Sequence, residues 1–264
     1  MARSRGAGIP WVVLAAGVLG VAFAIVPVAS IGARAAWSRA PTILASDAAR
    51  AALRLSLVVS TAAAAVDVLL GAPLGLVLAR ASFRGKSLVR AAVLLPLVLP
   101  PVVAGVGLLA AAGRRGVFGG ALAAIGVQLP FTTAGAVVAT AFISLPFVVL
   151  ASEAGFLGVD PRLEGAAHAM GASSWTVLRR VTLPLARDHL AAGVVLAWAR
   201  ALGEFGATLM FAGNLIGRTQ TLPLAVFELS QTDPFGSLVL ALVLVAISIA
   251  IIVALRARLL PARR

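Results

Sequence analysis

Residues 160–184 read DPRLEGAAHAMGASSWTVLRRVTLP, a polar, helix-forming stretch in a sequence that is otherwise almost wholly apolar. Its opening Asp-Pro pair predicts a helix start, because the carboxylate caps free backbone N–H groups and proline loses nothing at the first helical position. Gly171 predicts the end of that helix, since glycine enters the left-handed conformation at low cost. Ser173 can cap a second helix, which Pro184 should end. The stretch therefore predicts two short helices joined by a glycine elbow.

Apolar residues recur at helical spacing in both predicted helices, so each helix should have one apolar side. These residues are Leu163, Ala166, Ala167 and Met170 in the first helix and Trp175, Leu178 and Val181 in the second. A short amphipathic hairpin of this kind needs a surface for its apolar side. Two interpretations are open: a loop that rests on lipid headgroups, and a docking element for a soluble partner.

The composition indicates an integral membrane protein. Of 264 residues, 61% are hydrophobic and 12% are charged, and the mean hydropathy is +1.06, which is typical of membrane proteins and not of soluble domains. The absence of cysteine excludes disulfides and Cys-ligated metal centres. His168 and His189 lack ligand-like neighbours, so we expect no metal and no cofactor. The net charge of +13 would suggest nucleic acid in a soluble protein, but we expect no such partner for a membrane protein.

Several apolar stretches are long enough to cross a bilayer of about 30 Å as helices. We place six of them near 11–33, 55–79, 89–112, 131–156, 190–213 and 236–257. The first follows Arg3 and Arg5, and its apolar run is longer than that of a typical signal peptide. We therefore expect an uncleaved anchor. The predicted fold class is all-α, a polytopic membrane protein with about six transmembrane helices.

The distribution of Lys and Arg between the loops predicts the orientation in the membrane. The set of loops that includes both termini and residues 160–184 carries most of these residues. Both termini and the hairpin should therefore be cytoplasmic. The first external loop is also rich in arginine, and we expect its Arg50 and Arg54 to belong to an amphipathic lead-in to the second span.

Several spans should be irregular, because proline removes a backbone donor and leaves a carbonyl that lipid cannot satisfy. The prolines concerned are Pro73, Pro96, Pro100, Pro101 and Pro146. Gly71 and Gly75 form a G-x-x-x-G motif that permits close helix contact. Outside the membrane, the glycine-rich residues 113–130 predict a loop with a short surface or re-entrant helix. Residues 214–234 predict the largest external loop, with a short helix after Pro223.

Three ionisable residues, Asp67, Arg200 and Glu204, lie near the middle of predicted spans, where an unpaired charge costs several kcal/mol, so each is a functional candidate. Arg200 and Glu204 are four residues apart on one helix face, and we favour an internal ion pair over direct contact with a substrate. Asp67 has no local partner. We expect it to pair with an arginine of another span or to face a cavity.

Motifs for catalysis are absent from the sequence. Gly85-Lys86-Ser87 imitates the end of a phosphate-binding loop, but Arg80 stands where the first glycine is required. No G-x-S-x-G or H-E-x-x-H motif occurs. We therefore predict that the protein is not an enzyme, and that any ATP-driven work requires a nucleotide-binding site on another chain.

Taken together, these stretches resemble the permease subunit of a bacterial ABC importer of the molybdate and sulfate oxyanion family. Residues 164–184 resemble the cytoplasmic EAA loop of that family, with two alanines, Gly171 and a closing hydrophobic-Leu-Pro sequence. One departure is that Gly165 occupies the place of the family's glutamate, and Glu164 lies one residue earlier. Glu164 should point about 100° away around the helix, so the polar contact of the loop must differ or be shared.

Other stretches resemble molybdate permeases most. They are WARALGEFGATLMFAGNLIGRTQTLPL at 198–224, LPLVLPPVVAG at 95–105 and FTTAGAVVATAFISLPFVVL at 131–150. The resemblance implies a type I importer permease domain at 53–255, preceded by a transmembrane helix and external loop at 1–52 and followed by a basic cytoplasmic tail at 256–264. Sulfate, thiosulfate or tungstate permeases are the alternative within this class. An ion-coupled carrier or channel using Asp67 and Glu204, and a membrane scaffold, are the alternatives outside it.

The resemblance also implies a location in the inner (cytoplasmic) membrane of a bacterium, as well as partners and sites. Two permease subunits would form the pore within membrane lipid, two ATPase subunits would dock on the hairpin, and an extracytoplasmic binding protein would deliver the oxyanion. The ATPase-coupling residues would be Glu164, Ala166, Ala167, Met170, Gly171, Trp175 and Leu178. The pore or gate candidates are Asp67, Arg200, Glu204, Thr208, Met210 and Phe211, with an apolar narrowing near Thr208, Leu209, Met210 and Phe211.

Overall fold

A computed structural model describes residues 10–259, and this part of the chain contains helices and no strand. The predicted all-helical fold is confirmed. The helices are α1 (Trp11–Arg34), α2 (Ala40–Ala45), α3 (Asp47–Arg80), α4 (Lys86–Val98), α5 (Pro101–Ala112), α6 (Gly119–Ala124), α7 (Thr133–Leu157), α8 (Pro161–Ala169), α9 (Ser174–Val177), α10 (Leu183–Leu202), α11 (Gly206–Ala212), α12 (Leu222–Thr232) and α13 (Pro234–Leu259), with a 3-10 turn η1 (Trp37–Arg39) and a π-helical segment η2 (Leu178–Thr182).

The orientation predicted from Lys and Arg depends in part on arginines at the two ends of the chain. Arg3, Arg5, Arg263 and Arg264 lie outside the described residues. Arg256 and Arg258 lie in the last turns of α13, and their side chains are likewise outside what the structure describes.

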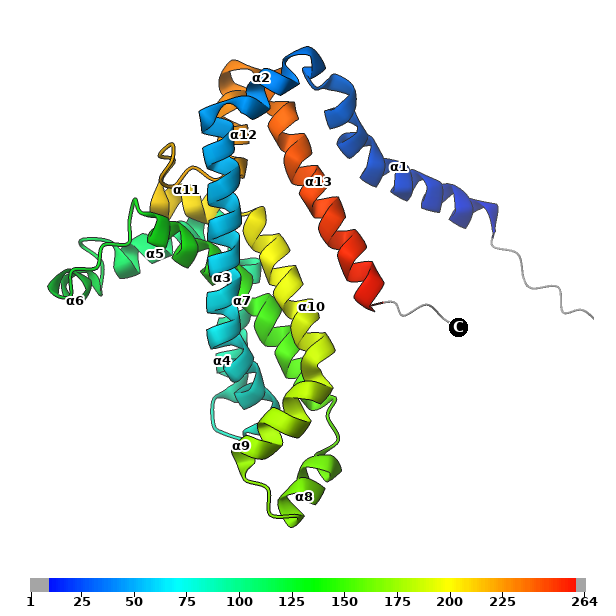
Figure 1. Cartoon of the computed structure of the whole chain (residues 1–264), viewed down its shortest axis with the longest axis vertical. Coiled ribbons are helices and arrows are strands. Elements are labelled where there is room, and N and C mark those ends of the chain that lie inside the picture. The colour runs from blue at the N-terminus through cyan, green and yellow to red at the C-terminus, as the bar shows by residue number, and fades with distance from the viewer. Residues whose placement is uncertain (1–9, 260–264) are drawn as a thin grey trace, which may run out of the picture.

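The centre of the molecule is a bundle of α3, α7 and α10 (Figure 1). α3 runs along α7, and their contact is made largely by small residues. Gly71 and Gly75 are both buried, and a Cβ added at Gly75 would lie 2.6 Å from the Cβ of Ser152. The predicted close contact through the G-x-x-x-G motif is therefore present, and α7 is its partner.

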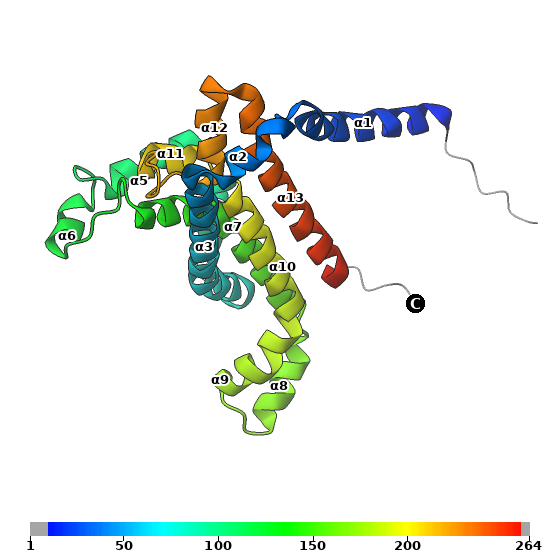
Figure 2. The same cartoon turned by 45° about the horizontal axis from the view of Figure 1, so that its top comes forward.

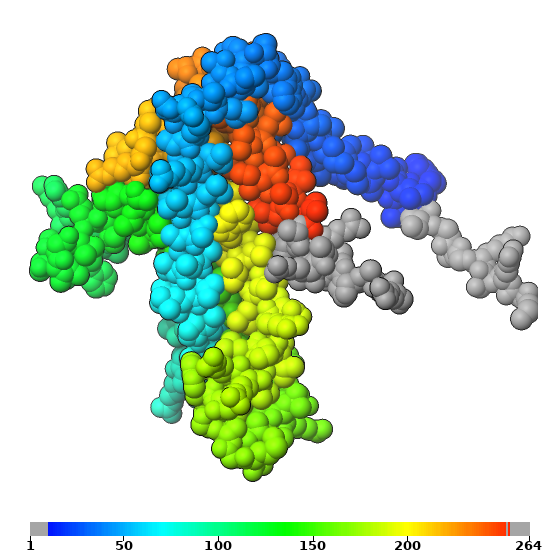
Figure 3. All heavy atoms as spheres, in the orientation of Figure 1, coloured from blue at the N-terminus to red at the C-terminus, as the bar shows by residue number. Residues whose placement is uncertain are grey.

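The bundle has two distinct ends, which are visible in Figure 1. We call the end that carries α8 and α9 the hairpin end, and the opposite end, which carries α2 and α12, the cap end. α5 and α6 extend to one side of the bundle and α1 to the other in both views (Figures 1 and 2). α1 contains no buried residue, and it leaves the body as a separate rod in the space-filling view (Figure 3).

The predicted spans differ in how continuous they are. Four helices, namely α1, α3, α7 and α13, are each long and apolar enough to cross a membrane. The span predicted near 190–213 is a pair of segments, 174–202 and 206–212, bent by 64°. The stretch predicted as one span at 89–112 is divided into α4 and α5, because Pro100 and Pro101 both lack the N–H that would continue the helix. Each half is shorter than the roughly 30 Å of a bilayer core.

The loops follow the predictions more closely. The glycine-rich residues 113–130 hold the six-residue α6, and a short helix, α12, begins at Leu222, beside the proline that was expected to start it. Arg50 and Arg54 lie in the first turns of α3, which begins at Asp47 and extends beyond the predicted span.

An ion pair between Arg39 and Asp233 links two segments at the cap end. Arg39 donates two hydrogen bonds to Asp233, at 2.6 and 3.0 Å, and Gly236 N–H donates a third at 3.0 Å. The Arg39 guanidinium therefore holds the pKa of Asp233 below its ordinary value. Because Asp233 lies between α12 and α13, this pair connects η1 to the turn that precedes α13.

The packing of α3 on α7 gives a direct test. Gly75→Leu should reduce stability by about 1–3 kcal/mol, because the new side chain would meet the backbone of α7 as well as Ser152. Thermal unfolding of the detergent-solubilised protein measures the change. Gly107→Leu in α5 is the matched control, because nothing lies within 4 Å of a Cβ at that position. An equal loss of stability in both variants would contradict the account.

Candidate functional site

Local capping shapes the hairpin of residues 160–184 as predicted. The Asp160 carboxylate accepts a hydrogen bond from the Arg162 N–H at 2.9 Å and so caps α8. Gly171 has a φ of +86°, in the left-handed region, where other residues would be strained. Ser173 Oγ accepts from the Thr176 N–H at 3.3 Å and caps α9. These three residues turn the chain through the hairpin.

Pro184 does not end the second helix, so that prediction is wrong. The helix that begins at Ser174 continues through η2 into α10, and Pro184 lies in the first turn of α10. Proline lacks an N–H and clashes with the carbonyl four residues earlier. The π-helical segment absorbs this defect, since the Leu183 N–H bonds to Leu178 O, five residues back. The second arm of the hairpin is therefore a direct extension of α10 into the bundle.

Glu164 fastens the hairpin to the bundle. One of its oxygens accepts from Arg80 Nη2 at 3.0 Å and from Thr182 Oγ1 at 2.7 Å. Arg80 is the last residue of α3 and also donates to Val159 O at 3.3 Å. Since Thr182 lies at the start of the α10 arm and is buried, one carboxylate joins α8 to both α3 and α10.

The departure at residue 165 therefore has a structural meaning. A Cβ at Gly165 would meet nothing within 4 Å, so a carboxylate in that place would point away from the protomer. Glu164, one residue earlier, turns inward to Arg80 and Thr182 instead. In this chain, therefore, Glu164 holds the hairpin against α3 and α10.

The apolar side of the hairpin is mostly uncovered. Ala167 and Val177 are buried, whereas Met170 is 83% exposed, Trp175 is 68% exposed and Leu163 is 50% exposed. Ala166 is also exposed, and Leu178 is half-buried. The first predicted stripe thus packs on the protomer only through Ala167. Met170 and Trp175 therefore leave apolar surface exposed near the tip of the hairpin.

Asp67 lies in the middle of α3 and is fully buried. Its Oδ2 accepts from Ser144 Oγ of α7 at 2.5 Å, and its Oδ1 has no hydrogen-bond partner. Within residues 10–259 no arginine pairs with Asp67, so the expected ion pair with another span is not present. The packing of small residues between α3 and α7 brings a serine to this place instead of a longer, charged side chain.

Arg200 and Glu204 form the predicted ion pair, with 2.8 Å between Arg200 Nη2 and Glu204 Oε2. The Glu204 side chain is 1% exposed, and its Oε1 accepts from the Ala207 N–H at 2.9 Å. Because that N–H belongs to the first turn of α11, Glu204 holds the bend between α10 and α11. The pair therefore has a clear structural role.

The four residues of the predicted gate divide into two groups. Thr208 and Phe211 are 0% exposed and lie inside the protomer, where Phe211 packs with Ala207 and Ile143. Leu209 and Met210 are half-buried. Thr208 Oγ1 lies 3.4 Å from Thr140 Oγ1 of α7. Of the four residues, Leu209 and Met210 are the ones that remain partly accessible, and their role as a gate stays a prediction.

Sequence reasoning missed the contacts that link distant helices. Arg90 of α4 pairs with the buried Glu153 of α7, and Ser144 and Thr182 supply the hydroxyls described above. A carboxylate inside an apolar span was a usable signal for Glu153. No sequence signal singles out Ser144 or Thr182, because short hydroxyl side chains are common in membrane helices.

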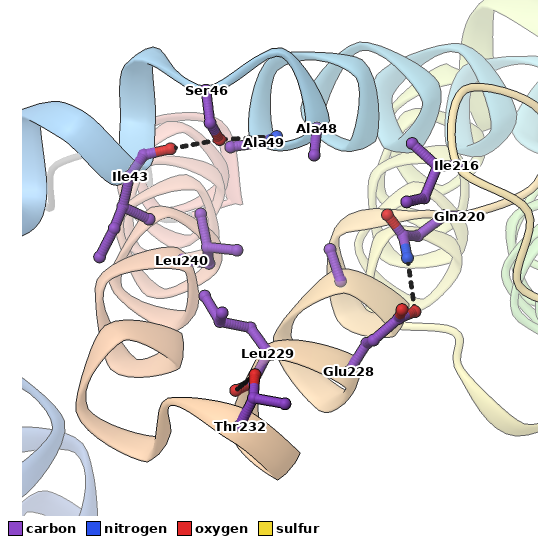
Figure 4. Close-up of a pocket in the computed structure, with 11 residues that line it drawn as sticks. Ile43, Ser46, Ala48, Ala49, Ile216, Gln220, Glu228, Leu229, Thr232 and Leu240 are labelled. Carbon is purple, nitrogen blue, oxygen red and sulfur yellow. Dashed lines mark hydrogen bonds between the residues drawn. The ribbon is translucent and has the colours of Figure 1, made fainter.

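A hollow of about 290 Å³ lies at the cap end between α2, α3, α12 and α13 (Figure 4). Its walls are mainly apolar, and its charged lining residue is Glu228, which accepts from Gln220 at 2.8 Å. A carboxylate in the wall would repel an oxyanion. The hollow is therefore unsuited to hold an anionic substrate. Within residues 10–259 no three His, Asp or Glu side chains gather into a metal site either.

Comparisons with known proteins agree with this arrangement. A family model described as binding-protein-dependent transport system inner membrane component matches residues 71–264. Among curated proteins, the molybdenum transport system permease protein ModB of Mycobacterium tuberculosis is 42% identical over 248 residues, which cover 94% of each chain. The protein of the same name from Escherichia coli K12 is 43% identical over 202 residues, covering 76% of this chain and 88% of that one.

A solved structure is similar in fold. The crystal structure of a bacterial alginate ABC transporter in complex with alginate pentasaccharide-bound periplasmic protein matches with a TM-score of 0.71 over 94% of both chains. The sequence identity is 16%, so the similarity concerns the course of the chain and not its specificity.

The anchoring of the hairpin predicts its local stability. Glu164→Ala removes two hydrogen bonds to neighbouring helices and should increase hydrogen–deuterium exchange of residues 161–177 about tenfold, allowing for the partial exposure of the pair. Arg162→Ala is the matched control, because Arg162 lies on the same helix and its side chain makes no hydrogen bond or ion pair among the described residues. Unchanged exchange in Glu164→Ala would contradict the role given to this carboxylate.

Proposed function

Because this chain belongs to the family of binding-protein-dependent transport system inner membrane components, we propose that it is the transmembrane subunit of an ATP-driven importer for molybdate. One observation carries the proposal: the 42% identity to a molybdenum permease extends along 94% of the chain. The resemblance predicted from residues 95–105, 131–150 and 198–224 is thereby confirmed at the level of the family. The relatives named as molybdenum permeases favour molybdate over sulfate, thiosulfate or tungstate.

A separate ATPase supplies the energy. The protein is a transport subunit and carries no phosphate-binding loop: Lys86 begins α4 after a turn at Gly85, and a helix precedes that turn where a nucleotide-binding fold has a strand. ATP hydrolysis on a partner chain must therefore reach this subunit as a mechanical movement. Such a movement requires an exposed contact surface that is rigidly joined to the membrane helices.

The hairpin has both properties. Its tip exposes Met170 and Trp175, the adaptable and aromatic residue types that dominate protein contacts. Its base is fixed by Glu164 to the ends of α3 and α10. The ATPase seats on the tip, and its closure moves the hairpin together with these two helices. Ala166, Ala167, Gly171 and Leu178 shape the same surface and complete the set of coupling residues.

The orientation and the assembly follow from this role. The hairpin end faces the cytoplasm, where ATP is available, and both termini lie on that side, as the distribution of Lys and Arg predicts. Residues 53–255 form the permease domain, and two copies of this chain enclose the pore. An extracytoplasmic binding protein delivers the oxyanion at the cap end.

The passage of a dianion sets conditions on the pore. Glu204 does not repel the substrate, because Arg200 neutralises it at 2.8 Å and the Glu204 side chain is buried. Leu209 and Met210 are the half-buried apolar residues of α11 and form the narrowing that opens and closes. An apolar constriction excludes ions when narrow and admits them when wide, without binding them.

The docking role predicts the effect of one substitution. In the complex with its ATPase, Trp175→Ala should weaken ATPase binding at least about tenfold, because a central aromatic residue of an interface contributes about 2 kcal/mol or more. Titration of the ATPase onto the permease in nanodiscs measures the affinity. Trp37→Ala, at the cap end and 62% exposed against 68% for Trp175, should leave the affinity unchanged.

Transport itself is tested by reconstitution. Proteoliposomes that contain the permease, its ATPase and the binding protein should take up labelled molybdate when ATP is supplied on the hairpin side. Unlabelled molybdate should compete, and sulfate should not. Uptake that proceeds without the ATPase and follows a proton gradient would contradict the proposal.

A further inference from the structure

A row of buried polar groups crosses the bundle from α3 to α11. Asp67 of α3 is bonded to Ser144 of α7 at 2.5 Å, and Ser144 Oγ is also 2.9 Å from Thr140 O, one turn earlier on α7. Thr140 Oγ1 is in turn 3.4 Å from Thr208 Oγ1 of α11. All four residues are at most 1% exposed. The proposed function leaves this row without a role.

Stability alone does not account for Asp67. A buried carboxylate with one oxygen unpartnered costs free energy that an apolar residue of similar size would not. A role in binding the oxyanion is excluded, because the side chain is 0% exposed and an anionic group would repel a dianion. A buried hydrogen bond requires a specific geometry, so it fixes the axial register of one helix against another.

The interface between α3 and α7 needs such a fixed point. Elsewhere it is formed by small residues such as Gly71, Gly75 and Ser152, which let the helices approach closely but do not set their register. Between these two helices, in the part of the chain that the structure describes, Asp67 to Ser144 is the side-chain hydrogen bond. This bond therefore decides whether a movement of α3 along its axis is passed to α7 or lost as sliding.

The row begins on α3, which also contacts the hairpin, and ends on α11, which carries the proposed narrowing. Arg80, at the hairpin end of α3, holds Glu164 of the hairpin at 3.0 Å. Asp67 lies about 20 Å away along the same helix, at 1.5 Å per residue. At the other end, Thr208 lies in α11, next to Leu209 and Met210.

We propose that Asp67 is a positioning residue for transport, acting through Ser144, Thr140 and Thr208 to pass the movement of the hairpin from α3 to α11. The inference rests on the proposed function, because it assumes that an ATPase moves the hairpin. Asp67 contacts neither substrate nor ATPase. It keeps the register of α3 against α7 while the hairpin is displaced.

Single-atom changes test the relay with little risk to the fold. Ser144→Ala and Thr208→Val each remove one hydroxyl from the row and keep the shape of the side chain closely. In the reconstituted complex both should bind the ATPase normally, and molybdate taken up per ATP hydrolysed should fall about tenfold, within the usual range of coupling between sites. Asp67→Leu should have the same effect, whereas Asp67→Asn, which can still bond to Ser144, should restore most of the coupling.

A matched control separates the relay from helix contacts in general. Thr61→Val, also on α3, removes the hydrogen bond from Trp198 Nε1 of α10 at 3.1 Å and lies outside the row. It should leave the uptake per ATP unchanged. The proposal is overturned if Ser144→Ala and Thr208→Val take up as much molybdate per ATP hydrolysed as the wild type. It is also overturned if Thr61→Val lowers this ratio as much as they do.

A second readout does not depend on the substrate. The chain has no cysteine, so Arg162→Cys and Leu215→Cys, which lie outside the docking surface and the narrowing, can carry a pair of spin labels, one on the hairpin and one in the loop that follows α11. Addition of ATP to the complex should change the distance between the labels, and Ser144→Ala should abolish that change. A wild-type complex that shows the change without molybdate uptake would reject the proposed substrate and support the relay. An equal change in Ser144→Ala would reject the relay.

Discussion

One carboxylate, that of Glu164, connects the hairpin, which is the proposed docking element, to the helices of the bundle. Its contacts with Arg80 and Thr182 fix α8 to the ends of α3 and α10 at once. Without them the hairpin would be joined to the bundle mainly through the chain itself and the packing of Ala167 and Val177. In the proposed function, the transmission of movement from an ATPase to the bundle therefore depends on this short-range polar contact.

The helices of the bundle that Glu164 contacts pack closely, because small side chains lie between them. Small residues let α3, α7 and α10 lie tightly together, and glycines stand where a neighbouring helix leaves no room for a side chain, as Gly193 does against Ala151. Few polar bonds are needed in such an interior, and three of them lie at the bend before α11, at its contact with α7, and at the middle of α3. Close packing gives stiffness, and these bonds give register.

Much of this could be predicted from the sequence, where the determining interactions are local. Asp160, Gly171 and Ser173 act within four residues of themselves, and Arg200 and Glu204 are one helical turn apart, so their spacing already defines their geometry. Composition and the length of the apolar stretches were enough for the polytopic helical class, and residues 164–184 for the family.

The failures have physical causes of two kinds. Pro184 was expected to end a helix, but a π-helical turn offers another way to accommodate a missing N–H, and the choice depends on packing around α10. The partner of Asp67 lies 77 residues away, and only the packing of α3 against α7 brings Ser144 to it. The inward turn of Glu164 likewise depends on Arg80, which lies 84 residues away in the sequence.

The central claim is that the tip of the hairpin seats in the ATPase. Because the chain has no cysteine, a single cysteine at Met170 can carry a short photo-crosslinker in the assembled complex, with a single cysteine at Val117 as the control, since both positions are 83% exposed. The account predicts crosslinking to the ATPase from Met170→Cys and none from Val117→Cys. No crosslink from Met170→Cys, in a complex that still transports molybdate, would contradict it.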